Sequence, residues 1–92
     1  MSQRIRKVES LVQHAVATRL HELLGLGTVS VTGVEVSPDI KSATIWVGVL
    51  AGSEEERRGM FSEVSNLRGE LQSELAAQMK SKYVPRITLR LD

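Results

Sequence analysis

A β-hairpin can be read directly from residues 29 to 50 of this chain, and it constrains the fold more than any other feature. Two runs in which apolar and polar residues alternate, V-S-V-T-G-V-E-V and S-A-T-I-W-V-G-V, stand on either side of a turn built on S-P-D. Residues 3–24 and 54–79 carry apolar residues at the spacing of amphipathic helices, and I-T-L-R-L near the end predicts another strand. The order helix, strand, strand, helix, helix, strand predicts a single α+β domain over residues 1–92.

Local signals place several boundaries. The first helix is expected from about Gln3 to Leu24, and Gly25 and Gly27 are expected to end it. In the first strand the apolar residues shift from odd to even positions at Gly33, which predicts a β-bulge. Ser53 and the three glutamates after it form a capping box, so the second helix is expected to begin there. Adjacent helical positions point in different directions, so these glutamates are expected to compensate the helix dipole and not to bind a metal.

The helical pattern over residues 54–79 is too long for so small a domain if the helix is straight. Gly69 interrupts this pattern, and glycine costs roughly 1 kcal/mol relative to alanine inside a helix. The pattern therefore predicts a bend near Gly69, or a close approach of another backbone at that residue.

Trp46 is expected on the less buried face of the sheet, because Ala43, Ile45 and Val47 alternate with it. An exposed tryptophan could stack on a nucleobase. It could also cover an open sheet face without a ligand, and the sequence favours this second interpretation.

Composition excludes several function classes. The chain has 92 residues and no cysteine, so disulfides and thiolate metal sites are excluded and a cytoplasmic location is expected. No stretch is apolar enough to span a membrane, and the basic start lacks the apolar core of a signal peptide. His14 and His21 lie about 10 Å apart along the first helix, so they cannot share a metal without a further ligand. We expect a protein that is not an enzyme and has no cofactor, metal or small-molecule substrate.

Charge is unevenly distributed although the net charge is only +1. Residues 1–24 hold four basic and two acidic groups, residues 25–75 hold four and eight, and residues 76–92 hold four and one. Both ends are therefore basic and the middle is acidic. If the fold brings the ends together, one side of the domain suits phosphates. The alternative is that these charges only solvate helix ends.

Two segments resemble the bacterial ribosome-binding factor A family. V-T-G-V-E-V-S-P-D-I-K-S-A at 31–43 is similar to the family's hairpin, and Y-V-P-R-I-T-L-R-L-D at 83–92 is similar to its ending. The resemblance spans nearly the whole chain and implies a KH-like domain of type II, with a three-stranded mixed sheet and helices on one face. It aligns Gly69 with the glycine of the family's alanine-x-glycine kink. Leu67 stands where alanine is usual, Gln72 stands where arginine is frequent, and the chain stops at Asp92, before the charged tail of many members.

The resemblance implies that backbone amides at the kink bind phosphate, so Asn66, Arg68 and Gly69 are candidate RNA contacts. Arg4, Arg6 and Lys7 open the first helix, where their charges oppose its dipole and a phosphate partner would relieve them. Lys80, Lys82 and Arg86 follow the third helix and are expected to complete the basic side, although the two lysines could instead serve that helix's negative end. We expect the basic start and the bend to form one continuous surface.

By resemblance the chain is expected to be a monomeric, cytoplasmic assembly factor. It would bind the immature small ribosomal subunit and its rRNA and assist late rRNA maturation, including processing of the rRNA start. The alternative is a protein-interaction module or a homodimer that uses a sheet edge or the Trp46 face, with incidental basic ends.

Overall fold

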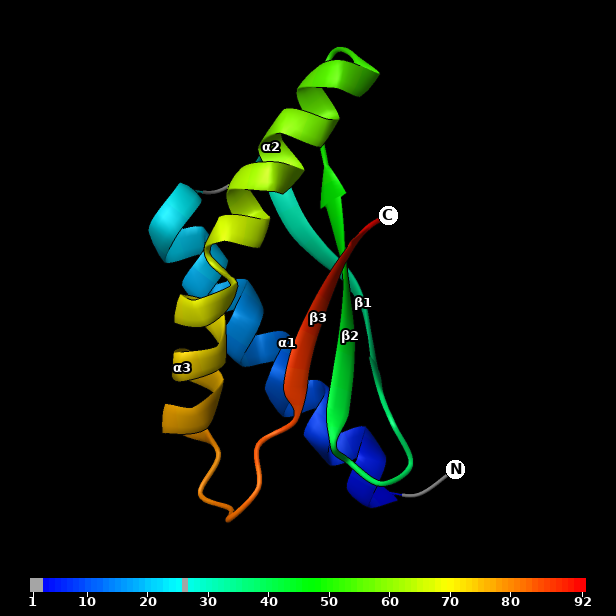
Figure 1. Cartoon of the computed structure of the whole chain (residues 1–92), viewed down its shortest axis with the longest axis vertical. Coiled ribbons are helices and arrows are strands. Elements are labelled where there is room, and N and C mark those ends of the chain that lie inside the picture. Colours follow the sequence, from blue (N-terminus) through cyan, green and yellow to red (C-terminus); the bar gives the residue numbers. More distant parts are fainter. Residues whose placement is uncertain (1–2, 26) are drawn as a thin grey trace.

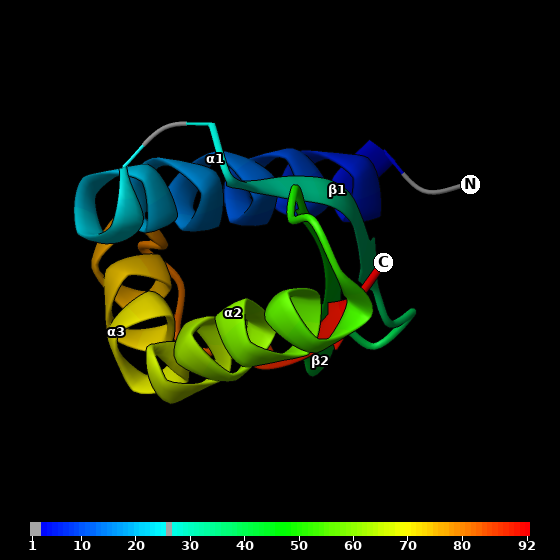
Figure 2. The same ribbon diagram turned by 90° about the horizontal axis from the view of Figure 1, so that it is seen from above.

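The fold is a three-stranded sheet with three helices. The computed structural model describes residues 3–25 and 27–92, with elements in the order α1 (Gln3–Leu24), β1 (Val29–Val36), β2 (Ser42–Val49), α2 (Glu54–Asn66), α3 (Arg68–Gln78) and β3 (Arg86–Leu91). The central strand β2 runs antiparallel to β1 and parallel to β3. The expected α+β class, element order and mixed sheet are confirmed. Figure 1 shows α1 crossing behind the sheet. Figure 2 shows that α1, α3 and the sheet surround the core.

One hydrophobic core fills the space between the helices and the sheet. On β2, Ala43, Ile45 and Val47 are fully buried, while Thr44 and Trp46 between them are partly exposed. The helices meet this face with buried aliphatic side chains, which are Val12, Ala15, Val16 and Leu20 of α1, Val64 of α2, and Leu71 and Leu75 of α3. The predicted orientation of Trp46 is therefore confirmed, because the residues alternating with it form the sheet's contribution to the core.

The helix ends follow the local signals. Gly25 and Gly27 adopt positive φ angles of 83° and 104° after α1, and the Gly25 amide donates to the His21 carbonyl at 2.9 Å. At the start of α2, the Ser53 hydroxyl accepts from the Glu56 amide at 3.1 Å. Both predicted boundaries are confirmed.

The predicted β-bulge lies in β1, where the register with β2 shifts between Val31 and Gly33. Thr32 is the extra residue, and its hydroxyl donates to the Trp46 carbonyl at 3.3 Å. A side chain on Gly48 would place its Cβ 2.8 Å from the Thr32 methyl group, so glycine at 48 makes room for the bulge.

The hairpin turn is held by side chains as well as by the backbone. The Asp39 carboxylate accepts from the Ser37 hydroxyl at 2.6 Å and from the Lys41 amide at 3.1 Å. The hydrogen bond from the Ser37 hydroxyl holds the pKa of Asp39 below its usual value, and the hydrogen bond from the Lys41 amide adds a smaller effect in the same direction. Ile40 adopts a φ of 59° in this turn, an uncommon conformation for a β-branched residue. The S-P-D signal therefore encodes a specific hydrogen-bonded turn.

Candidate nucleic-acid interface

The long helical pattern bends at Leu67, between α2 and α3. The Leu67 amide donates to the Val64 carbonyl at 3.0 Å, three residues back, and its φ and ψ of −91° and 3° leave the helical region. The predicted bend is therefore present, but it lies two residues before Gly69. Gly69 has a negative φ and belongs to the first turn of α3. A glycine is not required there by the backbone.

The start of α3 faces solvent without a capping side chain. Arg68, Gly69 and Glu70 form its first turn, where the amides have no acceptor within α3 itself. Gly69 is exposed, and a Cβ at this position would meet nothing within 4 Å. These amides, together with the positive end of the α3 dipole, can bind an anion that approaches close to the backbone.

Two side chains of α3 tie this bend to the edge of the sheet. Arg68 donates from Nε to the Ile87 carbonyl at 2.7 Å. Gln72 donates to the Pro85 carbonyl at 2.8 Å, and its amide oxygen accepts from the Ile87 amide at 2.8 Å. Gln72, which stands where arginine is frequent in the family, therefore has a structural role in this chain. Sequence reasoning missed it, because neither periodicity nor charge indicates which side chain faces a strand edge.

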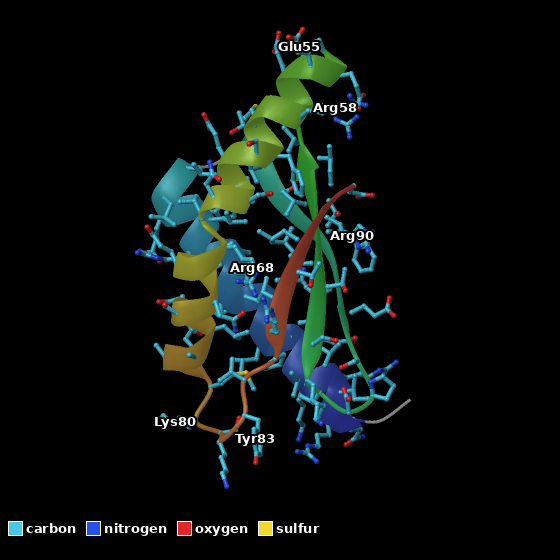
Figure 3. All side chains as sticks on the ribbon, in the orientation of Figure 1. Glu55, Arg58, Arg68, Lys80, Tyr83 and Arg90 are labelled. Carbon is cyan, nitrogen blue, oxygen red and sulfur yellow. The ribbon has the colours of Figure 1, made fainter. Side chains whose placement is uncertain are left out.

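A hollow of about 300 Å³ lies between the bend and β3. It is lined by Ser65, Arg68, Arg86, Ile87, Thr88 and Leu89. Arg86 and Thr88 are exposed, and in Figure 3 Arg68 lies between α3 and β3. We call Asn66, Arg68, Gly69 and Arg86 the bend surface. It combines the uncapped start of a helix with two guanidinium groups, which are donors that suit phosphate. Ser65 and Thr88 were not predicted, although the alternation of β3 places Thr88 on the same side as Arg86.

The basic start of α1 does not join the bend surface, so the expected single continuous surface is wrong. Arg19 in the second half of α1 lies 3.6 Å from Glu70 in the first turn of α3, which fixes that half of the helix beside the bend. Arg4 precedes Arg19 by 15 residues, about 22 Å along a helix axis. Figure 1 shows that the start of α1 lies away from the bend. Arg4, Arg6 and Lys7 belong to this first part of the helix and are exposed. The length and direction of α1 separate the two groups.

Basic residues from three separate segments line one cavity near the start of α1. A cavity of about 400 Å³ is lined by Arg4, Lys41 and Lys82 together with apolar side chains, Val8, Ile40 and Met79 among them. Lys80 is exposed in the same loop as Lys82, and Figure 3 shows it far below Arg68. We call Arg4, Arg6, Lys7, Lys80 and Lys82 the basal surface. The nine predicted contacts thus divide between two surfaces, and Lys41 is a basal cation that the sequence did not single out.

Two further features bear on possible functions. Among the described residues, no group of three His, Asp or Glu side chains could hold a metal ion. None of the helices that they form is long and apolar enough to cross a bilayer.

Comparison with known proteins identifies the family. The profile described as "Ribosome-binding factor A" matches residues 4–92. The chain belongs to the ribosome-binding factor A family. Ribosome-binding factor A of Rubrobacter xylanophilus is 35% identical over 97% of this chain and 74% of its own length. The Geotalea daltonii protein is 33% identical over 100% of this chain and 76% of its own length. The match to the Brevibacillus brevis protein is 36% identical but spans only 73% of this chain and 54% of that protein.

Solved structures of the family share the fold. A Thermotoga maritima protein assigned to ribosome binding factor A has a TM-score of 0.81 at 23% identity, over 98% of this chain and 88% of that one. The Thermus thermophilus crystal structure gives 0.77 at 20% identity, over 95% and 93%. A homology model of the Thermus thermophilus factor, fitted into a cryo-EM map of its complex with the 30S subunit, matches with a TM-score of 0.70 at 20% identity, over 91% of this chain and 90% of that one.

Proposed function

We propose that this chain, as one KH-like domain over residues 1–92, binds the immature small ribosomal subunit through rRNA phosphates. It would assist late rRNA maturation, including processing of the rRNA start. Membership of the ribosome-binding factor A family supports the ribosomal partner. The 30S complex of the Thermus thermophilus relative supports the small subunit in particular. The proposed role is non-enzymatic and cytoplasmic, without a cofactor or small-molecule substrate.

The observation that carries the proposal is the open backbone at the start of α3. No side chain caps the first turn of α3, and a Cβ on Gly69 would meet nothing within 4 Å. Arg68 and Arg86 place positive charge beside the same hollow. Arg68 is held in position by the Ile87 carbonyl, so less side-chain entropy is lost when its remaining donors meet a phosphate.

The basal surface would supply a second set of phosphate contacts. Its cations lie on the first turns of α1 and on the loop before β3, so they can reach a different stretch of the same rRNA. No acidic residue stands in the first turn of α1, which leaves the dipole of that helix opposed by its own cations. A phosphate beside Arg6 and Lys7 would reduce this repulsion.

The alternative is a homodimer or another protein complex formed through a sheet edge. Both edges are partly occupied within the chain, which favours a monomer. Glu9 accepts from the Val36 amide on β1 at 3.0 Å, and Arg68 and Gln72 occupy the backbone groups of Ile87 on β3. The bulge in β1 also disrupts that edge as a template for pairing. Analytical ultracentrifugation would distinguish the two, since the proposal requires a monomer at micromolar concentration.

Co-sedimentation with immature and mature small subunits tests the function. We expect a preference for the immature particle, and a loss of about two to three decades in affinity between 50 and 200 mM salt if four to five phosphates are bound. Arg86→Ala should reduce the salt slope by about one, and a triple Ala variant of Arg4, Arg6 and Lys7 by about three. Arg58→Ala is the matched control, because Arg58 is an exposed arginine on α2, distant from both surfaces (Figure 3).

Two results would reject the proposal. Equal binding to mature and immature particles would indicate general attraction to a polyanion. Binding that hardly responds to salt would indicate an apolar protein interface instead.

A further inference from the structure

The face of the sheet that points away from the core carries a set of side chains that shares only Arg86 with the bend surface. Alternation along the strands places Thr44 and Trp46 of β2 and Arg86, Thr88 and Arg90 of β3 on this face. We call these five residues the outer sheet face. Figure 3 shows Arg90 on the opposite side of β3 from Arg68, and no helix covers it there.

Trp46 and Arg90 are direct neighbours across the parallel strands, and Thr44 faces Thr88 in the next row. Trp46 is partly exposed. Its ring lies beside Gly33 on β1, where a Cβ would be 3.8 Å from the ring carbon Cε3. Because Gly33 lacks a side chain, the indole ring can lie against β1 without being enclosed by a neighbour. A flat aromatic ring beside a guanidinium group, flanked by hydroxyls, is a combination that stacks nucleobases.

No ion pair among the described residues neutralises the arginines of this face, although Glu9 and Glu35 line a hollow together with Trp46 on the β1 side. The ion pairs among the described residues involve Arg19, Arg57 and Arg58, and none involves Arg86 or Arg90. The acidic residue of the neighbouring strand, Glu35, faces Thr44 at the β1 side. Phosphates are therefore attracted toward β3 and repelled from β1, which sets the path of a nucleic-acid backbone along β3.

The outer sheet face is continuous with the bend surface. Arg86 and Thr88 line the hollow beside Arg68 and also belong to the row of side chains that leads to Arg90. An RNA strand bound at the bend can thus pass over β3 and reach Trp46 without leaving the protein surface. A duplex cannot use this route in the same way, because its bases are already stacked.

We propose that the outer sheet face binds a single-stranded RNA segment, with one base stacked on Trp46 and the adjoining phosphates beside Arg90 and Arg86. The inference rests on the proposed RNA-binding function and specifies the form of RNA that is bound. A protein partner fits this face less well, because the centre of a protein interface is depleted in charge and this face carries two arginines, one of them paired with Trp46 across the strands.

Trp46 is the only tryptophan of the chain, so its fluorescence reports directly on stacking. We would titrate the full chain at 50 mM salt with a fluorescein-labelled single-stranded octaribonucleotide and with the same strand in a duplex. Unlabelled RNA would be used for fluorescence and labelled RNA for anisotropy. The expected result is saturable quenching of Trp46 by the single strand and none by the duplex.

Variants separate stacking from general attraction. Trp46→Leu should weaken octamer binding about tenfold to a hundredfold, and Trp46→Phe should retain most of it because a phenyl ring still stacks. Arg90→Ala should weaken binding and reduce the salt slope by about one, whereas Arg58→Ala should change neither. If Trp46→Leu does not fold, Arg90→Glu tests the same face at an exposed position and should abolish the quenching.

The inference fails if the octamer binds without quenching Trp46, or if Arg90→Ala and Trp46→Leu bind like the parent chain. It also fails if Trp46→Leu weakens subunit binding without affecting the octamer, since that result indicates a protein contact. In each case, a retained preference for immature subunits would leave the proposed function standing. Loss of a preference for immature subunits would reject the proposed function. Quenching of Trp46 by the octamer would then still decide whether a base stacks on this face.

Discussion

Replacing Gly69 by alanine should separate the stability of this domain from its binding to the ribosomal subunit. A Cβ at Gly69 meets nothing within 4 Å, and φ at this residue is not positive, so the domain itself accommodates the methyl group. Alanine also loses less backbone entropy than glycine on entering a helix. We therefore expect Gly69→Ala to raise the free energy of unfolding by about 0.5 kcal/mol, or the melting temperature by roughly 2–4 °C.

Subunit binding should change in the opposite direction. A phosphate that accepts from the amides of Arg68, Gly69 or Glu70 must approach the backbone where the new methyl group would project. Losing one charge-assisted hydrogen bond costs about 1.5–3 kcal/mol, which corresponds to roughly a tenfold to hundredfold weaker complex. Calorimetry measures the first effect, and co-sedimentation with immature subunits measures the second.

Gly59→Ala in α2 is the matched control. Gly59 is also an exposed helical glycine, its φ is not positive, and a Cβ there also meets nothing within 4 Å. The same chemical change at Gly59 should raise stability by about 0.5–1 kcal/mol and leave binding unchanged. Equal subunit affinity of the two variants would refute the assignment of the α3 start as a phosphate site. A lower melting temperature for Gly69→Ala would refute the argument from open space.

Two further substitutions test the packing at the edge of β3 and at the bulge in β1. Gln72→Ala removes the side-chain partners of the Pro85 carbonyl and the Ile87 amide, and should lower the free energy of unfolding in urea by about 1–3 kcal/mol. The control Gln78→Ala loses one hydrogen bond to Glu74 and should lower it by less than about 0.5 kcal/mol. Equal costs would show that the strand edge does not depend on Gln72. Gly48→Ala should cost about 1–3 kcal/mol because its Cβ lies 2.8 Å from the Thr32 methyl group. Thr32→Ser removes that methyl, so a cost of Gly48→Ala that is unchanged in the Thr32→Ser background would exclude the clash.

Local patterns predicted the elements of this fold well. The three-residue and four-residue spacing from Gln3 to Leu24 matches the bounds of α1, and the glycines after it adopt the expected left-handed conformation. The shift of alternation at Gly33 located the bulge to within one residue. These features depend on neighbours in sequence, which is why the sequence is sufficient to predict them.

The bend was predicted less accurately. The argument that a helix over residues 54–79 must bend holds, but the position chosen for it was a glycine, and the chain bends at Leu67. Leu67 is half-buried and packs against the core, so tertiary contacts and not backbone freedom place the break. Gly69 is consistent with keeping the approach to the α3 amides open.

What the sequence alone determined is the set of elements, the inward and outward faces of each strand, and the presence of basic groups at both ends of the chain. What only the tertiary structure decided is which of these groups lie together. Buried packing holds α1 against α3, and the contact of Arg19 with Glu70 shows which end of α1 lies at the bend. The remaining length of the helix carries Arg4 to the other end of the molecule. Conversely, the parallel pairing of β2 with β3 brings Trp46 beside Arg90, residues 44 positions apart in the chain. Such distances follow from how elements pack against one another, a property that no local pattern contains.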